Sequence, residues 1–214
     1  MKVIIGLNSF HADSSACLIQ DNTLKFGIEE ERINRVKHWA GFPSASIKYC
    51  LLSENLDLNE VTDICINTNP LSNINNKIFY FLKNFVLGPK KFEIFQRLKK
   101  KISLKENFNN LIEGQKLNKN IKIHYIDHHL SHISSSFFSS GFDKSMGLSV
   151  DGFGDFTSIA IAECSAQEIK IIKKIYFPHS LGVFYEAFTQ LIGFQNYGDE
   201  YKMMGLSSYG NSGL

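Results

Sequence analysis

The sequence predicts an α/β fold, because short apolar runs typical of strands alternate with segments whose apolar residues recur at helical spacing. Strands are expected at 3–7, 16–19, 23–29, 61–69, 121–126, 146–150, 157–164 and 168–177. The first three are separated by short turn-prone segments, which favours an antiparallel arrangement. Helices are expected from Ser44, as a possible N-cap, to about Leu52, from an Asp127 cap to about Ser140, and over 181–194.

Length and composition limit the class of protein. The 214 residues, 43% of them hydrophobic, are enough for one large domain or two small lobes. A net charge of +2 gives no reason to expect a nucleic-acid or acidic-membrane partner. The N-terminus has no signal peptide, no stretch approaches a transmembrane span, and the four cysteines form no CxxC pair. We therefore expect a cytoplasmic protein with reduced cysteines.

Residues 70–120 differ in character from the rest of the chain. They are rich in Asn, Lys and Phe, and the stretch PKKFEIFQRLKKKISLKENF is strongly basic. We interpret the segment as an amphipathic helical insertion. Nucleic-acid binding is one explanation of the basic stretch, but a solvated helix face with Phe and Ile turned inward is favoured.

A weak internal repeat suggests a phosphate-binding architecture. GLSVDGFGDFTSIAIAE and its downstream strand repeat the strand–turn–strand–turn–strand order of the first 30 residues. Facing turns of this kind hold nucleotide phosphates in the actin/Hsp70/sugar-kinase superfamily. Gly152 and Gly154 would let the backbone approach a ligand closely, whereas Asp151 and Asp155 would repel phosphate unless a cation lay between them.

The hexapeptide Asp127-His128-His129-Leu130-Ser131-His132 predicts a metal site. On a helix, His128 and His132 lie one turn apart on one face, while His129 points elsewhere. The next strand ends at Asp151, which would add a carboxylate. Two imidazoles and one carboxylate suit iron, zinc or manganese, although an HxxxH pair alone is more often two ordinary histidines.

Several segments resemble the NodU/CmcH-type carbamoyltransferases, in the order in which that family has them. They are GLNSFHADSSACLI, EEERINRVKHWAGFP, DHHLSHISSSFFSSGF, SVDGFGD, HSLGVFYEAFTQLIGF and GDEYKMMGLSSYG. The resemblance spans most of the chain except 70–120. It implies an actin/Hsp70-like (ASKHA) fold with 1–145 as the first lobe and 146–214 as an incomplete second lobe. A C-terminal YrdC-like domain would be absent.

The resemblance also implies residue roles. His128, His132 and Asp151 match the family's metal ligands, with iron the expected ion. His11 matches a catalytic histidine, and an imidazole, whose ordinary pKa is about 6.5, can take a proton from a hydroxyl. The alternative for His11 is a turn histidine in solvent. Lys37 would contact carbamoyl-adenylate, with a surface lysine as the alternative.

The segment Ser180–Gly182 matches the family's SLG string at the start of a helix. The backbone N–H groups of Ser180, Leu181 and Gly182 would bind the adenylate, alongside Asp151. The alternative is that Ser180 is only an N-cap. Lys202 and Gly205 also match, without an assigned role.

The implied reaction transfers a carbamoyl group to the hydroxyl of a small molecule. Carbamoyl-adenylate would be formed from ATP and carbamoyl phosphate by the YrdC-like domain. A fourth metal ligand would come from an Asp farther along, so we expect residues 1–214 to need a missing C-terminal portion or a partner chain. Two alternatives are an ATPase or kinase of the same fold and a non-catalytic nucleotide-binding remnant.

Overall fold

The computed structural model describes residues 1–83, 104–109, 111, 115–211 and 213. It divides into two compact units, one formed by Met1–Ile74 and Ile78–His128, the other by Asn75–Lys77 and His129–Leu214. The predicted lobe boundary between 145 and 146 stays a prediction, and the division into compact units falls inside helix α6 (His128–Ser140). The physical reason is that α6 packs through Ile133 and Phe137 on the sheet of the second unit.

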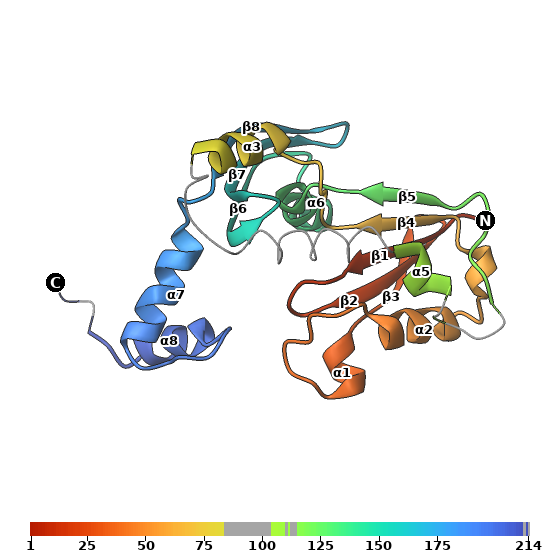
Figure 1. The fold of residues 1–214 in the computed structure, drawn as a ribbon, viewed down its shortest axis with the longest axis horizontal. Coiled ribbons are helices and arrows are strands. Elements are labelled where there is room, and N and C mark those ends of the chain that lie inside the picture. The colour runs from red at the N-terminus through yellow and green to blue at the C-terminus, as the bar shows by residue number, and fades with distance from the viewer. Residues whose placement is uncertain (84–103, 110, 112–114, 212, 214) are drawn as a thin grey trace. The chain divides into compact units, whose positions relative to one another are not determined.

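The first unit is built on a five-stranded mixed sheet of order β3-β2-β1-β4-β5 (Figure 1). The strands are β1 (Val3–Asn8), β2 (Ser15–Gln20), β3 (Thr23–Glu29), β4 (Asp63–Ile66) and β5 (Lys122–Tyr125). The first three are antiparallel, as predicted, whereas β4 runs parallel to both β1 and β5. The order places β1 in the centre.

Alternation along β1 builds the core of this unit. Val3, Ile5 and Leu7 are buried at 0%, 0% and 4% exposure, because successive side chains of a strand point to opposite faces. Helix α2 (Ser44–Ser53) covers β2 and β3 and contributes Ile47 and Leu51, both fully buried. The apolar residues that recur at helical spacing in α2 therefore face the core, as predicted.

A buried carboxylate, rather than the predicted Ser44 cap, satisfies the start of α2. The residue in the N-cap position is Pro43, which makes no side-chain cap bond. Glu30, at the start of α1 (Glu30–Asn34), accepts the backbone N–H groups of Ala45 and Ser46 at 3.0 and 2.8 Å. It also accepts the Ser46 hydroxyl at 2.8 Å. Negative charge beside orphan N–H groups stabilises a helix N-terminus.

The second unit contains a three-stranded antiparallel sheet of order β6-β7-β8. Its elements are α6, β6 (Lys144–Gly154), β7 (Thr157–Ser165), β8 (Ile169–Tyr176), α7 (Leu181–Leu191) and α8 (Glu200–Ser207). Strand β6 is longer than the predicted 146–150 and carries Asp151 near its end. Helix α8 was not predicted.

The two faces of this sheet differ. On one face, Ile133 and Phe137 of α6 pack with Ala160 and Ala162 of β7. On the other face of β6, Met146, Leu148 and Val150 are 62%, 67% and 49% exposed. Since these three residues alternate along the strand, they form one apolar row.

The predicted internal repeat is present as two three-stranded meanders. Each has one two-residue turn with positive φ at both positions, the type I′ pattern that matches strand twist, between β2 and β3 in the first meander and between β6 and β7 in the second. The turns are Asp21–Asn22 (φ 48° and 65°) and Asp155–Phe156 (φ 50° and 71°). The meanders, with the parallel β4 and β5 beside the first, agree with the predicted actin/Hsp70-like α/β fold.

The segment 70–120 is described only in part. Helices α3 (Ile74–Lys83) and α5 (Leu104–Asn109) agree with the predicted helical insertion, and a 3₁₀ turn, η1 (Leu58–Glu60), precedes β4. Most of the basic stretch lies outside the described residues, so its interpretation stays a prediction. Among the helices that are described, none has the length and apolar character to cross a bilayer.

Glu30→Gln is expected to lower the free energy of unfolding by about 2 kcal/mol, since an amide cannot accept all three bonds and turns a donor toward N–H groups. Urea unfolding monitored by circular dichroism measures the change. The matched control is Glu29→Gln, which removes an exposed ion pair with Arg32 and should cost less than about 0.5 kcal/mol. Equal effects of the two variants would contradict this account of α2.

Candidate metal centre

Helix α6 and strand β6 bring the predicted metal ligands together. One ligand atom each from His128, His132 and Asp151 lies within 4.8 Å of the others. His132 Nε2 and Asp151 Oδ2 are 3.6 Å apart. Two atoms bound tetrahedrally at about 2.0–2.1 Å from one ion are roughly 3.3 Å apart, so this donor set fits a divalent metal ion.

The carboxylate of Asp151 is oriented by its own backbone neighbour. The Gly152 N–H donates to Asp151 Oδ1 at 2.6 Å, while Oδ2 is the oxygen nearest to His132. His128 is buried, whereas the side chains of His132 and Asp151 are 54% and 32% exposed. The group is therefore open on one side, which leaves room for water or a ligand.

The start of α7 is attached to the same strand end. Ser180 is the N-cap, because its Oγ accepts the Val183 N–H at 3.1 Å. The hydroxyl also contacts the carbonyl oxygens of Gly152 at 2.7 Å and Asp151 at 3.1 Å, as their donor. Ser180 is therefore an N-cap that is also linked to the backbone at Asp151, and binding of the adenylate by the neighbouring N–H groups stays a prediction.

Gly182 makes the closest approach in this region. A Cβ there would lie 2.6 Å from Gly152 N and 2.7 Å from the Asp151 carbonyl atoms. Leu181, the residue between Ser180 and Gly182, is 59% exposed. Ser180 and Gly182, which flank Leu181, therefore both contact the backbone of Asp151 and Gly152.

His11, the predicted catalytic base, lies beside His128. Their ring centroids are 5.6 Å apart. His11 belongs to the loop between β1 and β2, and its backbone oxygen accepts the Ser14 hydroxyl at 2.9 Å. Asp127, which was expected to cap α6 or orient an imidazole, accepts the Ser72 hydroxyl at 2.7 Å.

A second group of possible ligands was missed in the sequence. It consists of Asp13, Glu31 and His38, whose ligand atoms lie within 4.8 Å of one another. His38 Nδ1 is 2.8 Å from Asp13 Oδ1, and the His38 backbone N–H donates to Glu31 Oε2 at 3.0 Å. Glu31 and His38 both belong to the EEER…KH segment, which was the part of the sequence that could have indicated this group. These contacts join the His11 loop to the loop with Lys37.

The loop with Lys37 is bound to the His11 loop by backbone contacts as well. Phe10 N–H donates to the Gly41 oxygen and Ser14 N–H to the Trp39 oxygen, both at 3.0 Å. Lys37 itself is exposed on its loop. Two predicted site residues, His11 and Lys37, therefore lie on loops whose conformations are coupled.

Three of the cysteines, Cys17, Cys50 and Cys65, are unsuited to act as nucleophiles. All four are free thiols, as predicted. Burial raises the pKa of Cys17 and of Cys65, and burial together with the neighbouring Cys17 raises the pKa of Cys50 to about 12. A raised pKa keeps the thiol protonated at neutral pH, whereas nucleophilic chemistry needs the thiolate.

Lys202, a residue of the YKMMGL string, is paired within its own helix region. Its Nζ lies 2.6 Å from Asp199 Oδ1. This hydrogen bond lowers the pKa of Asp199 and raises the pKa of Lys202. The ammonium group is therefore held at the start of α8.

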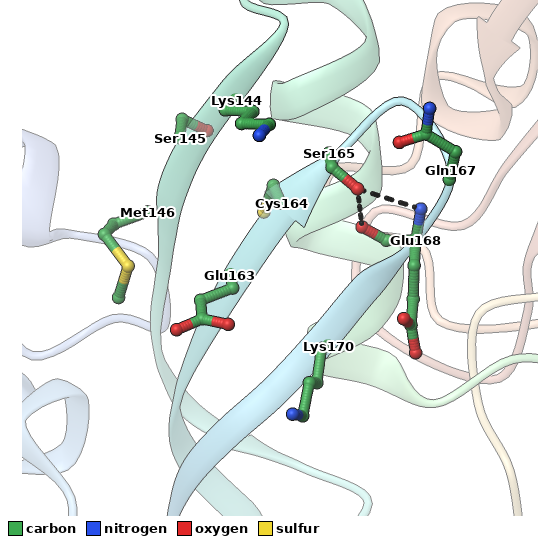
Figure 2. A pocket seen from close by; sticks show the side chains of 9 residues that line it. All are labelled: Lys144, Ser145, Met146, Glu163, Cys164, Ser165, Gln167, Glu168 and Lys170. Carbon is green, nitrogen blue, oxygen red and sulfur yellow. Dashed lines mark hydrogen bonds between the residues drawn. The ribbon is translucent and has the colours of Figure 1, made fainter.

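An open depression of about 580 Å³ lies at the other end of β6, near the β7–β8 turn (Figure 2). Its charged lining is balanced, with Lys144 and Lys170 against Glu163 and Glu168. It contains none of the predicted site residues. The depression thus gives no chemical reason to prefer it over the group at Asp151.

Fold and site together define an α/β protein with a candidate metal centre of two imidazoles and one carboxylate. Residues 3–213 match the family described as "Carbamoyltransferase N-terminus". The chain belongs to this family.

Curated relatives extend over nearly the whole chain. It is 33% identical over 215 residues to the uncharacterized protein sll1178 of Synechocystis sp., covering 98% of this chain and 35% of the relative. It is 32% identical over 205 residues to nodulation protein NolNO of Sinorhizobium fredii, covering 95% of this chain and 28% of the relative. The chain therefore spans about a third of the length of these relatives.

Among solved structures, the chain is similar to YeaZ from Pseudomonas aeruginosa, at 9% identity and a TM-score of 0.44 over 83% of this chain and 68% of that one. It is also similar to an uncharacterized protein described as resembling peptidase YEAZ from Pseudomonas aeruginosa, at 12% identity, a TM-score of 0.47 and coverage of 83% and 67%. No functional conclusion follows from a likeness at this level.

Gly182→Ala is expected to destabilise the second unit by about 1–3 kcal/mol, because a methyl group there overlaps backbone atoms that cannot rotate away. Gly205→Ala in α8 is the matched control. Its Cβ would meet nothing within 4 Å, so the better helix former should stabilise by about 0.5 kcal/mol. Urea unfolding compares the two. Destabilisation of similar size at both positions would contradict the close packing of α7 on β6.

Proposed function

We propose that this chain contributes the acceptor-side active site of a metal-dependent O-carbamoyltransferase. The observation that supports this most directly is the convergence of His128, His132 and Asp151 in a member of the carbamoyltransferase family. The substrate pair would be carbamoyl-adenylate and the hydroxyl group of a small molecule. This chain spans about a third of its relatives' length, so carbamoyl transfer would also need the regions that the relatives have outside that third.

His128, His132 and Asp151 would hold one divalent ion. Iron is our first choice by family, and the nitrogen-rich donor set also suits zinc or manganese. Such an ion, when bound, would act as a Lewis acid that offsets negative charge on the substrate. A further ligand from a later part of the protein or from a partner chain would complete the coordination, because three protein donors leave positions open.

His11 would serve as the general base. The acceptor hydroxyl attacks the carbamoyl carbon, its proton passes to the imidazole, and the bond from that carbon to the phosphate oxygen breaks to release AMP. The mixed anhydride is already activated, so orientation of the hydroxyl is the main requirement. The position of His11 beside His128 supports this role.

Two elements would hold the adenylate. The ammonium group of Lys37 would offset the phosphate charge, and the contacts between its loop and the His11 loop would fix its distance from the base. At the start of α7, the N–H groups of Leu181 and Gly182 belong to the first helical turn, where backbone donors lack intrahelical acceptors. A phosphate or ribose hydroxyl is a suitable acceptor for such groups.

His128→Ala is expected to abolish near-stoichiometric binding of iron(II) or zinc(II), because loss of one of three protein ligands leaves an incomplete site. Metal content after anaerobic loading and desalting is measured by plasma mass spectrometry. The control is His179→Ala, an exposed histidine outside the ligand group, which should bind metal like the unmodified protein. Equal metal content in both variants would refute the centre.

A further variant, His11→Asn, separates metal binding from carbamoyl transfer. The assay supplies an adenylate-forming domain of a relative, ATP, carbamoyl phosphate and a set of hydroxyl compounds. His11→Asn should keep the metal and lose at least about 100-fold of acceptor-dependent AMP release, the usual contribution of a general base. Unchanged AMP release by His11→Asn would contradict its assignment as base.

A further inference from the structure

We propose that His129 is a positioning residue of the metal centre. It would fix the rotation and height of α6 on the sheet, so that His128 and His132 meet Asp151. This inference depends on the metal site of the proposed function. The sequence spacing predicted that His129 points away from the metal ligands, and in the structure its side chain contacts β6 and β7 instead.

The imidazole of His129 is completely buried and hydrogen-bonded at both nitrogens. Its exposure is 0%. Nδ1 lies 2.8 Å from Ser149 Oγ in β6, and Nε2 lies 2.9 Å from the backbone oxygen of Thr157 in β7. A single side chain thus connects the first turn of α6 to two adjacent strands.

These partners define which nitrogen carries the hydrogen. The Thr157 carbonyl oxygen can only accept, so Nε2 must be the donor. In the neutral ring Nδ1 is then an acceptor, and the Ser149 hydroxyl donates to it. The ring is therefore held as the Nε2–H tautomer by two bonds of opposite direction.

Ser149 lies two positions before Asp151 on β6. Side chains at i and i+2 of a strand point to the same face, so both residues face α6. On the helix, His129 follows His128 and precedes His132. The contact between His129 and Ser149 therefore lies next to the contact between His132 and Asp151, and it joins the same two elements.

A second observation shows how closely α6 approaches β6. A Cβ at Gly147 would lie only 2.6 Å from Ile133 Cγ2. Gly147 and Ser149 alternate along β6 and so face the helix together. Apolar packing of Ile133 against a glycine sets the separation of the two elements but leaves the helix free to slide and turn.

The two bonds of His129 remove that freedom, because hydrogen bonds are directional whereas apolar contacts are not. A buried polar ring also costs more than an apolar one of the same size unless it is bonded. A metal centre gains from the histidine, because its ligands must be held to within about half an ångström.

The test uses zinc(II) as the probe, with affinity measured by competition against a chromogenic chelator. His129→Phe is expected to weaken zinc binding at least about tenfold, the effect typical of losing a group that orients metal ligands. Ser149→Ala removes one of the two bonds and should weaken binding by several fold. Cys164→Ala shortens a buried side chain in the apolar cluster of Ile133 but removes neither bond of His129, so it should leave zinc affinity within about twofold of the unmodified protein.

A second readout does not depend on variants that fold poorly. In the metal-free protein, long-range ¹⁵N–¹H correlation spectra of imidazole-labelled histidine should show His129 as the Nε2–H tautomer. An Nδ1–H tautomer would overturn the inference, because Nε2 could then not donate to Thr157, as would zinc affinity in His129→Phe equal to that of Cys164→Ala. His128→Ala distinguishes the two levels: if it loses zinc while His129→Phe keeps it, the positioning role fails and the metal site stands. If His128→Ala also keeps zinc, both fail.

Discussion

The candidate site depends on one constraint, the fixed placement of helix α6 on strand β6. Two imidazoles from the helix and a carboxylate from the strand can share an ion only if neither element slides along the other. Packing of Ile133 over Gly147 brings the elements close, and the bonds of His129 to Ser149 and Thr157 fix their register. The close approach of Ile133 to Gly147 and the bonded ring of His129 thus serve the same purpose, which is to hold α6 in one position on β6.

The end of β6 is also held by the start of α7. Ser180 caps α7 and donates to the backbone around Asp151, while Gly182 lets that helix start against the same atoms. The segment Ser180–Gly182, which the sequence suggested for ligand binding, therefore has a structural role. Both roles are compatible, because the Ser180 side chain makes the cap and the tether whereas the following backbone N–H groups would face a ligand.

The sequence predicted the parts of this arrangement that follow from periodicity. A short apolar run marked 3–7 as a strand, and helical spacing put His128 and His132 on one face of α6. It could not predict that Glu30 would replace Ser44 at the start of α2, since that contact joins residues far apart in the chain. The Asp13–His38 contact and the bonds of His129 were missed for the same reason. Long-range polar contacts leave no periodic signal, whereas strands and helices do.

X-ray absorption spectroscopy of the iron- or zinc-loaded protein tests the shared-ion geometry most directly. The account predicts a first shell of light atoms at about 2.0–2.2 Å, with the outer-shell scattering of two imidazole rings that falls to one ring in His132→Ala. A spectrum without imidazole scattering, or one that His132→Ala leaves unchanged, would contradict the claim that α6 and β6 converge on a single metal ion.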